Sequence, residues 1–195
     1  MKKAIVFLAD GFEEIEALTP VDYLRRAGVE VTLAGVSKTE ITGSHGITVK
    51  TDIAVTEALV SEKFDALVVP GGMPGSTNLA ASAAVEKLLK DAESRGAVIA
   101  AICAAPVVVL AKAGLLKNRR YTCYPRMEND LAKFAGSNYK ALTDGAVHLE
   151  ERVVVDGNLV TARGPGVAEE FALILVEKLA GKTARDNLHN GIVAR

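Results

Sequence analysis

The sequence contains no tryptophan, and aromatic residues make up only 5% of its 195 positions. This scarcity argues against the aromatic platforms on which proteins stack the bases of single-stranded nucleic acids. The formal net charge of -1 also provides no basic surface for a polyanion. We therefore expect no nucleic-acid partner.

Long apolar runs are missing as well. No stretch reaches the length that a membrane-spanning helix needs. The first apolar run, residues 4–9, is too short for the core of a secretion signal, and Asp10 ends it with no small-residue cleavage site behind it. We expect a cytoplasmic protein without a membrane partner.

Cysteine and histidine are both scarce. Cys103 and Cys123 are the two cysteines, which fits a reducing compartment and cannot make a disulfide framework. Neither they nor the three histidines, His45, His148 and His189, show the spacing of metal ligands. We expect no metal site from this pattern.

The sequence does contain a regular alternation of strand-like and helix-like segments. Such alternation predicts an α/β fold, with a mainly parallel sheet and helices on both faces, in one domain over residues 1–195. Strands are predicted over residues 3–9, 29–36, 46–50, 66–69, 97–102 and 121–124, and helices over residues 13–27, 77–81, 84–94, 104–113, 128–134, 167–179 and 183–189.

Two local signals refine this outline. Residues 152–163 predict a β-hairpin, because Asp156 and Gly157 form the dipeptide that a two-residue turn favours. Pro20 lies inside the first predicted helix and follows Thr19, a possible cap, so we expect a kink or a restart there.

Three turns follow predicted strands: "ADGFEEIEA" (residues 9–17), "PGGMPGS" (70–76) and "ICAAP" (102–106). In a parallel sheet the carboxyl ends of the strands share one edge, where ligands bind. We therefore expect these turns to meet.

Cys103 lies between a predicted strand and a predicted helix. A side chain at such a turn is lifted above the sheet, as in the nucleophile turn of the α/β hydrolases. A helix start also favours a thiolate, and thiols in that setting have pKa values of roughly 3.5–7.5. A packed thiol in a buried turn is the alternative, and position alone does not decide between them.

The other two turns could complete a site. The glycines of "PGG" let backbone amides face a ligand, and with the amide of Ala104 they could hold an oxyanion, although a plain strand-ending turn explains them too. The "EEIE" carboxylates suit the first turn of a helix. One of them could instead face Cys103 and stay protonated beside a thiolate.

Some chemistry is excluded. A cysteine peptidase or amidotransferase needs a histidine base, and no histidine lies next to Cys103 in the sequence. The "PGGMPGS" segment lacks the pattern of a phosphate-binding loop.

Together, "GFEEIEALTPVDYLRRAG", "VVPGG", "AAICAAP" and "RGPG" resemble the DJ-1 subgroup of the DJ-1/ThiJ/PfpI superfamily over nearly the whole chain. The resemblance implies a flavodoxin-like three-layer sandwich and a homodimer. It also implies a reactive, easily oxidised Cys103, a protonated Glu16 beside it, and oxyanion-type amides at Gly72 and Ala104. Gly71 belongs to the same implied pocket.

The sequence departs from this subgroup at several places. Tyr124 replaces a histidine that lines the pocket and is a candidate for the same position. His45 replaces an arginine of the partner-facing loop; it could reach the neighbouring subunit's pocket, and a surface histidine is the alternative that we favour. Ala104 replaces the histidine that follows the cysteine in the peptidase-like branch. Cys123 has no family role; it could be a resolving thiol or a small pocket-lining residue.

The resemblance implies a cofactor-independent enzyme that converts 2-oxoaldehydes, such as methylglyoxal, to hydroxy acids in the manner of a glyoxalase III, with removal of early glycation adducts as an extension. The alternative is an oxidative-stress sensor or chaperone whose Cys103 is oxidised to a sulfinate. A thiamine-pathway or peptidase role ranks last, because the histidine is missing.

Overall fold

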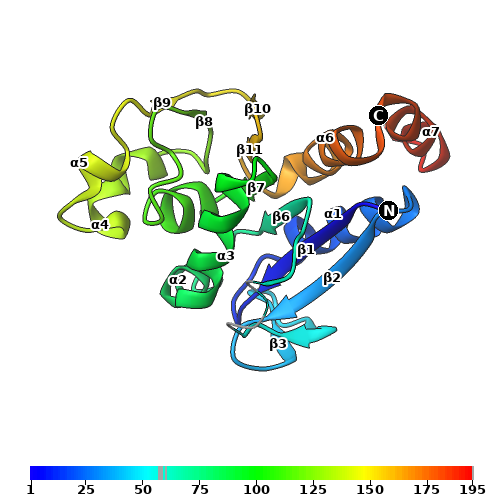
Figure 1. Ribbon diagram of the computed structural model, residues 1–195, viewed down its shortest axis with the longest axis horizontal. Helices are drawn as coiled ribbons and strands as arrows, with labels where there is room; N and C mark the ends of the chain where they lie inside the picture. Colours follow the sequence, from blue (N-terminus) through cyan, green and yellow to red (C-terminus); the bar gives the residue numbers. More distant parts are fainter. Residues whose placement is uncertain (57–58, 60, 195) are drawn as a thin grey trace.

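The computed structural model describes residues 1–56, 59 and 61–194. Its main sheet has seven strands in the order β10-β11-β7-β6-β1-β2-β5 (Figure 1). Neighbouring strands are parallel except for β10 and β11, so the mainly parallel sheet with an added hairpin is confirmed. The strands are β1 (Lys3–Leu8), β2 (Glu30–Gly35), β5 (Ile53–Ala54), β6 (Ala66–Val69), β7 (Val98–Ile102), β10 (Val153–Asp156) and β11 (Leu159–Ala162).

Both faces of the sheet are buried. In β1, Ile5 and Phe7 belong to one hydrophobic cluster, whereas Ala4, Val6 and Leu8 belong to the other. Strands β6 and β11 are buried at every position. Burial on both faces explains why these strands read as continuous apolar runs in the sequence.

Helices cover each face, which gives the expected three layers. Helices α2 (Gly75–Ala81) and α3 (Ala83–Ser94) contribute to the first cluster. Helices α1 (Glu14–Arg26) and α6 (Ala168–Ala180) contribute to the second, and α7 (Lys182–Gly191) packs against α6 (Figure 1). In the described part of the chain, no helix is long and apolar enough to cross a membrane.

Pro20 does not interrupt its helix. α1 runs from residue 14 to residue 26 as one segment, so the predicted restart with a Thr19 cap is wrong. Glu13 caps this helix instead, and its side chain accepts a hydrogen bond from the Glu16 amide at 2.8 Å. A proline removes one donor from the helix ladder, and the packing of α1 against α6 and the sheet keeps the helix continuous.

The segment after Cys103 forms a different helix from the α-helix predicted over residues 104–113. Its centre is a π-helix, η2 (Pro106–Leu110), in which the Ala111 amide bonds to the Pro106 carbonyl at 3.0 Å. Three consecutive β-branched valines follow Pro106 and weaken the preference for a regular α-helix.

Two of the predicted strands lie outside the main sheet. β4 (Thr48–Lys50) is shorter than predicted and pairs antiparallel with β3 (Glu40–Thr42). β8 (Arg120–Tyr121) replaces the strand predicted over residues 121–124 and pairs parallel with β9 (Val147–His148). The predicted strand is cut short because later amides bond elsewhere; that of Tyr124 donates to the Cys103 carbonyl at 2.8 Å.

In the second half of the chain, the helices also differ from those predicted from the sequence. The helix predicted over residues 128–134 is divided between a 3-10 turn, η3 (Met127–Asp130), and a short helix, α4 (Leu131–Ala135). A further short helix, α5 (Tyr139–Leu142), precedes β9, and a 3-10 turn, η4 (Pro165–Val167), precedes α6.

The hairpin turn lies one residue later than predicted. Asp156 pairs with Leu159, so Gly157 and Asn158 form the two-residue connection. Gly157 has φ +60°, a left-handed conformation that glycine adopts without strain.

Candidate active site

The three turns that follow β1, β6 and β7 lie at one edge of the sheet, as the sequence predicted. These strands are neighbours and parallel. The Glu13 amide donates to the Gly71 carbonyl at 3.0 Å, and the Gly71 amide donates to Oε2 of Glu16 at 2.9 Å. The turn after β6 is thus tied directly to the start of α1.

Cys103 occupies the sharp turn at the end of β7. Its φ is +64°, in the left-handed region that a residue with a side chain seldom adopts. Its amide donates to the Ala162 carbonyl at 2.9 Å, and its carbonyl accepts from the Tyr124 amide at 2.8 Å. These two bonds hold the strained conformation. Strain of this kind is concentrated at functional sites.

Glu16 is the one carboxyl of "EEIE" that faces the thiol. It is fully buried, and its Oε1 atom finds no hydrogen-bond partner among the described residues. Burial, with a further contribution from the nearby Glu13 carboxylate, raises the pKa of Glu16 to about 8. Glu16 therefore carries a proton at neutral pH.

The other two carboxyls have structural partners. Glu13 caps α1. Glu14 is buried and accepts hydrogen bonds from the backbone amide and Nδ1 of His45, both at 2.8 Å. The Glu14 carboxylate raises the pKa of His45, whose side chain is largely exposed. His45 therefore secures the loop beside α1.

The Cys103 thiol differs from the sequence expectation in one respect. Burial raises its pKa, and the Glu16 carboxylate beside it raises the pKa further, whereas the amides of Gly72 and Ala104 lower it. The lowered pKa predicted from a helix start is therefore wrong, because burial and Glu16 outweigh the two amides. Because Glu16 and Cys103 interact closely, their two protons dissociate as a coupled pair.

Glycine is required at both positions of "PGG". A Cβ atom on Gly71 would lie 2.6 Å from Cβ of Cys103 and 2.6 Å from Oε2 of Glu16. Gly72 has φ +87°, and a Cβ there would lie 2.4 Å from the Glu13 amide nitrogen. These glycines therefore allow the close approach of the three turns.

The cavity at Cys103 measures ≈ 470 Å³, a volume that suits a small ligand. Of the four candidate pocket residues, Tyr124 lines this cavity, and the described lining residues do not include His45, Gly71 or Cys123. Gly71 still contacts the site through Glu16. The lining residues are Gly72, Met73, Cys103, Ala104, Tyr124, Pro125, Arg126, Met127, Asp130, Lys133 and Phe134.

Sequence reasoning missed the outer wall of this cavity. Arg126, Asp130 and Lys133 come from the turn and short helices after Tyr124. The sequence pattern gave no signal for this wall, because it predicted a strand through residue 124, whereas β8 ends at Tyr121 and the following segment bonds to the Cys103 turn.

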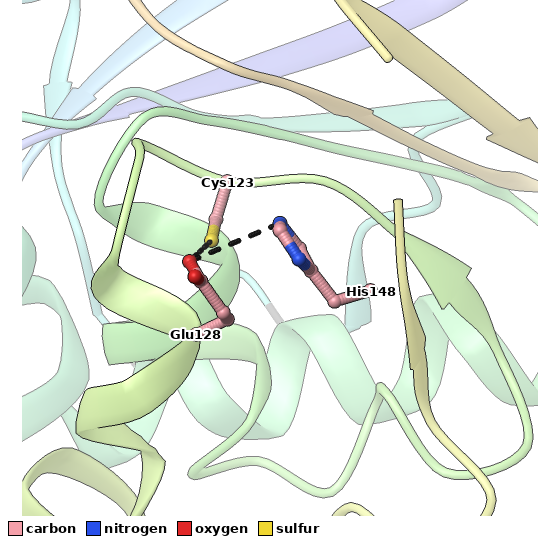
Figure 2. A group of neighbouring side chains, drawn as sticks. All are labelled: Cys123, Glu128 and His148. Atoms are coloured by element: carbon pink, nitrogen blue, oxygen red, sulfur yellow. Dashed lines mark hydrogen bonds and ion pairs between the residues drawn. The ribbon is translucent and has the colours of Figure 1, made fainter. Parts of the chain in front are cut away.

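Cys123 lies in a second cluster of polar groups (Figure 2). Its Sγ atom is 3.8 Å from Oε2 of Glu128, and Nε2 of His148 is 3.9 Å from the same oxygen. Burial, and then the Glu128 carboxylate, raise the pKa of Cys123 to about 12. In the described residues, this group and the group of Glu13, Glu14 and His45 have the donor atoms for a metal ion.

A family model described as DJ-1/PfpI family matches residues 2–178. Protein dj-1beta of Drosophila melanogaster is 42% identical over 98% of this chain and 97% of its own length. A glutathione-independent glyoxalase of Caenorhabditis elegans is 34% identical over 96% of this chain and 94% of its own. A deglycase of Pyrococcus abyssi is 37% identical over 84% and 91%.

Solved structures agree with this match. The crystal structure of Drosophila melanogaster DJ-1beta superposes with a TM-score of 0.89 at 40% identity, and covers 100% of this chain and 98% of its own. The structure of oxidized Toxoplasma gondii DJ-1 gives a TM-score of 0.88 at 36% identity, with coverage of 100% and 99%.

Proposed function

We propose that this chain, which belongs to the DJ-1/PfpI family, uses Cys103 and Glu16 to convert small 2-oxoaldehydes such as methylglyoxal to hydroxy acids, without glutathione or another cofactor. The observation that carries the proposal is the buried Glu16 carboxyl beside the thiol, with a pKa of about 8. A group with a pKa near the working pH serves both as proton donor and as proton acceptor.

The first step would be addition of the Cys103 thiol across the aldehyde group. A bond forms between Sγ and the aldehyde carbon, and the thiol proton ends on the aldehyde oxygen. The amides of Gly72 and Ala104, which act on the thiol, would stabilise the negative charge that develops on that oxygen. The product is a hemithioacetal.

The second step would be a proton transfer between the two adjacent carbons. The ionised fraction of Glu16 takes the proton from the hemithioacetal carbon, and the electron pair of that bond forms an enediolate with the neighbouring carbonyl, whose oxygen takes up the negative charge. Glu16 then returns the proton to the neighbouring carbon. The hydroxyl proton of the hemithioacetal passes to the neighbouring oxygen, which leaves a thioester carbonyl on Cys103. Water hydrolyses this thioester, releases the hydroxy acid and restores the thiol.

Pocket size and relatives support a small substrate. The cavity at Cys103 measures ≈ 470 Å³, near the lower end of the range of small-molecule sites. One relative is named a glyoxalase and another a deglycase. Removal of early glycation adducts would extend the same addition chemistry to an adduct carbonyl.

The decisive experiment follows lactate formation from methylglyoxal in the absence of glutathione. We expect activity in the wild type and in Cys123→Ser, and only background in Cys103→Ser. Glu16→Gln should lose about 10²–10⁴-fold, the usual contribution of a general acid–base group. Equal lactate formation by wild type and Cys103→Ser would refute the proposal.

A second candidate function is oxidative-stress sensing or chaperone protection. The amides of Gly72 and Ala104 that act on the thiol would also stabilise a sulfinate at Cys103, with Glu16 as proton donor. A related structure is described as oxidized. Intact-mass measurement after mild peroxide should show a gain of two oxygens, located at Cys103 by peptide mapping. Failure to modify Cys103 would count against this role.

The homodimer also belongs to the proposal. In the dimer implied by the family resemblance, the loop that carries His45 faces the neighbouring subunit. Size-exclusion chromatography with light scattering should give twice the chain mass of 20.5 kDa. A monomer at micromolar concentration would contradict it.

A further inference from the structure

We propose that Cys123, Glu128 and His148 form a binding site for a divalent transition metal of the zinc class, separate from the reaction at Cys103. Figure 2 shows the three side chains directed toward one another. Their donor atoms all lie within 4.8 Å of one another.

The donor set matches the chemistry of zinc. A cysteine sulfur, an imidazole nitrogen and a carboxylate oxygen are the three protein ligand types that zinc takes in tetrahedral sites. A thiolate favours borderline-soft metals over Mg²⁺ and Ca²⁺, which prefer oxygen alone. With one thiolate and one carboxylate, a bound divalent ion would be neutralised.

The spacing of these atoms also fits. Two ligands at about 2.0–2.3 Å from a tetrahedral metal lie roughly 3.3–3.8 Å apart. The observed separations from Oε2 of Glu128 are 3.8 Å to Sγ of Cys123 and 3.9 Å to Nε2 of His148. The third separation, between the Cys123 sulfur and the His148 imidazole, is within 4.8 Å. The donors would therefore have to close by up to about 1 Å to complete three coordination bonds.

The backbone holds the donors in place without a metal. β8 and β9 are paired with Tyr121 opposite His148, which brings Cys123, two residues after Tyr121, close to the imidazole. The rings of Tyr121 and His148 are 5.5 Å apart and inclined at 57°, so the tyrosine limits the orientation of the imidazole. Glu128 joins them from η3.

Hydrogen bonding accounts for one contact of this cluster, in which the Cys123 thiol donates to Oε2 of Glu128 at 3.8 Å, but not for the position of His148. A nitrogen–oxygen separation of 3.9 Å between His148 and Glu128 is too long for a hydrogen bond. Cys123 is completely buried, whereas the side chains of Glu128 and His148 are 26% and 22% exposed. The cluster is thus partly exposed, and a water molecule from solvent could supply the fourth ligand of a tetrahedron.

One nearby charge opposes metal binding. Arg163 is close enough to lower the pKa of Cys123, and its positive charge repels a cation. Its guanidinium is directed in part to the Glu150 carbonyl, at 2.9 Å. We therefore expect Arg163 to weaken the site rather than to abolish it.

Metal binding here is an exchange without electron transfer. The metal–sulfur bond replaces the bond between sulfur and hydrogen in Cys123, and one proton passes to solvent. The oxidation states of the metal and of the sulfur do not change, because a coordinated thiol is simply deprotonated.

Occupancy would act on the wall of the Cys103 cavity. Tyr124, Pro125, Arg126 and Met127 line that cavity and lie between Cys123 and Glu128 in the sequence. A metal would tie the two ends of this short segment together and would hold the cavity wall in one position.

The test uses Co²⁺ as a spectroscopic probe on the reduced, chelator-treated protein. A bound thiolate gives a sulfur-to-cobalt charge-transfer band, which reports the ligand itself. We expect this band with one equivalent of Co²⁺ in the wild type, and we expect Zn²⁺ to remove it by displacement. Absence of the band in the wild type would overturn the proposal.

Variants locate the site. Cys123→Ser should lose the band, and His148→Gln should weaken Co²⁺ binding at least about 100-fold, more than loss of an outer partner costs. Cys103→Ser and His45→Ala are matched controls at the other thiol and the other metal-capable group, and both should bind as the wild type does. A band that persists in Cys123→Ser, or disappears in Cys103→Ser, would overturn the proposal. If circular dichroism shows that Cys123→Ser is unfolded, the Co²⁺ affinity of His148→Gln decides the test, and an affinity equal to that of the wild type would overturn the proposal.

Discussion

The buried Glu16 carboxyl lies beside the Cys103 thiol, and a Cβ placed on Gly71 would touch both residues at 2.6 Å. A carboxyl and a thiol so close cannot both ionise freely, since each negative charge disfavours the other. The pKa of Glu16 is raised to about 8 by burial first and by Glu13 second. The ionisation of Cys103 therefore depends on the state of Glu16.

The first prediction concerns the alkylation of Cys103 as a function of pH. In the wild type, ionisation of Glu16 near pH 8 raises the pKa of the Cys103 thiol. The alkylation rate should therefore increase with pH over a wider range than the titration of a single group would produce. In Glu16→Gln this charge is absent, and the rate should follow a single titration. Iodoacetamide rates in a Cys123→Ser background measure both profiles. Two identical single-group curves would contradict the coupling.

The second prediction concerns stability. The folded protein holds the Glu16 proton up to a pKa of about 8, whereas an unfolded glutamate releases it near ~4.3. The folded state therefore binds more protons between these values, and stability should fall as the pH rises through this window. The free energy of unfolding of wild type relative to Glu16→Gln should decrease by up to ~4 kcal/mol from pH 4.5 to pH 8. If the difference in unfolding free energy between wild type and Glu16→Gln did not change with pH, Glu16 would be charged in the folded state.

The third prediction concerns Gly71. Gly71→Ala should destabilise the fold by about 1–3 kcal/mol and should displace Cys103 or Glu16, because the added methyl group overlaps both. Urea unfolding and the alkylation rate measure the two effects. Gly166→Ala is the matched control, since nothing lies within 4 Å of a Cβ at that exposed position. Equal stability of the two variants would show that the turn adjusts without cost.

The convergence of Glu16, Gly72 and Cys103 could be predicted from the sequence. Each follows a strand in a chain with strand–helix alternation, and parallel strands bring their carboxyl ends to one edge. The apolar runs of β1, β6 and β7 identify those strands because both faces of the sheet are covered. Local pattern and chain order were sufficient here.

Other features depend on contacts that no local pattern contains. Glu128 and His148 meet Cys123 only because β8 pairs with β9 across more than twenty residues. The direction of the Cys103 pKa shift depends on burial and on Glu16, and the helix-start rule accounts for neither. Pro20 likewise stays within α1 because tertiary packing opposes its local effect.

The last prediction separates the two thiols. Cys103 is partly exposed in a cavity, whereas Cys123 is completely buried and has a pKa near 12 because of burial and Glu128. Burial raises the pKa of both thiols, so accessibility sets the order of reaction. Peroxide or iodoacetamide at neutral pH should therefore modify Cys103 and leave Cys123 intact, because an inaccessible thiol reacts slowly. Peptide mapping at increasing reaction times measures the order. In Cys103→Ser no early modification should appear, and in Cys123→Ser the rate at Cys103 should equal that of the wild type. Early modification of Cys123, or a disulfide between the two cysteines, would instead favour a resolving role for Cys123.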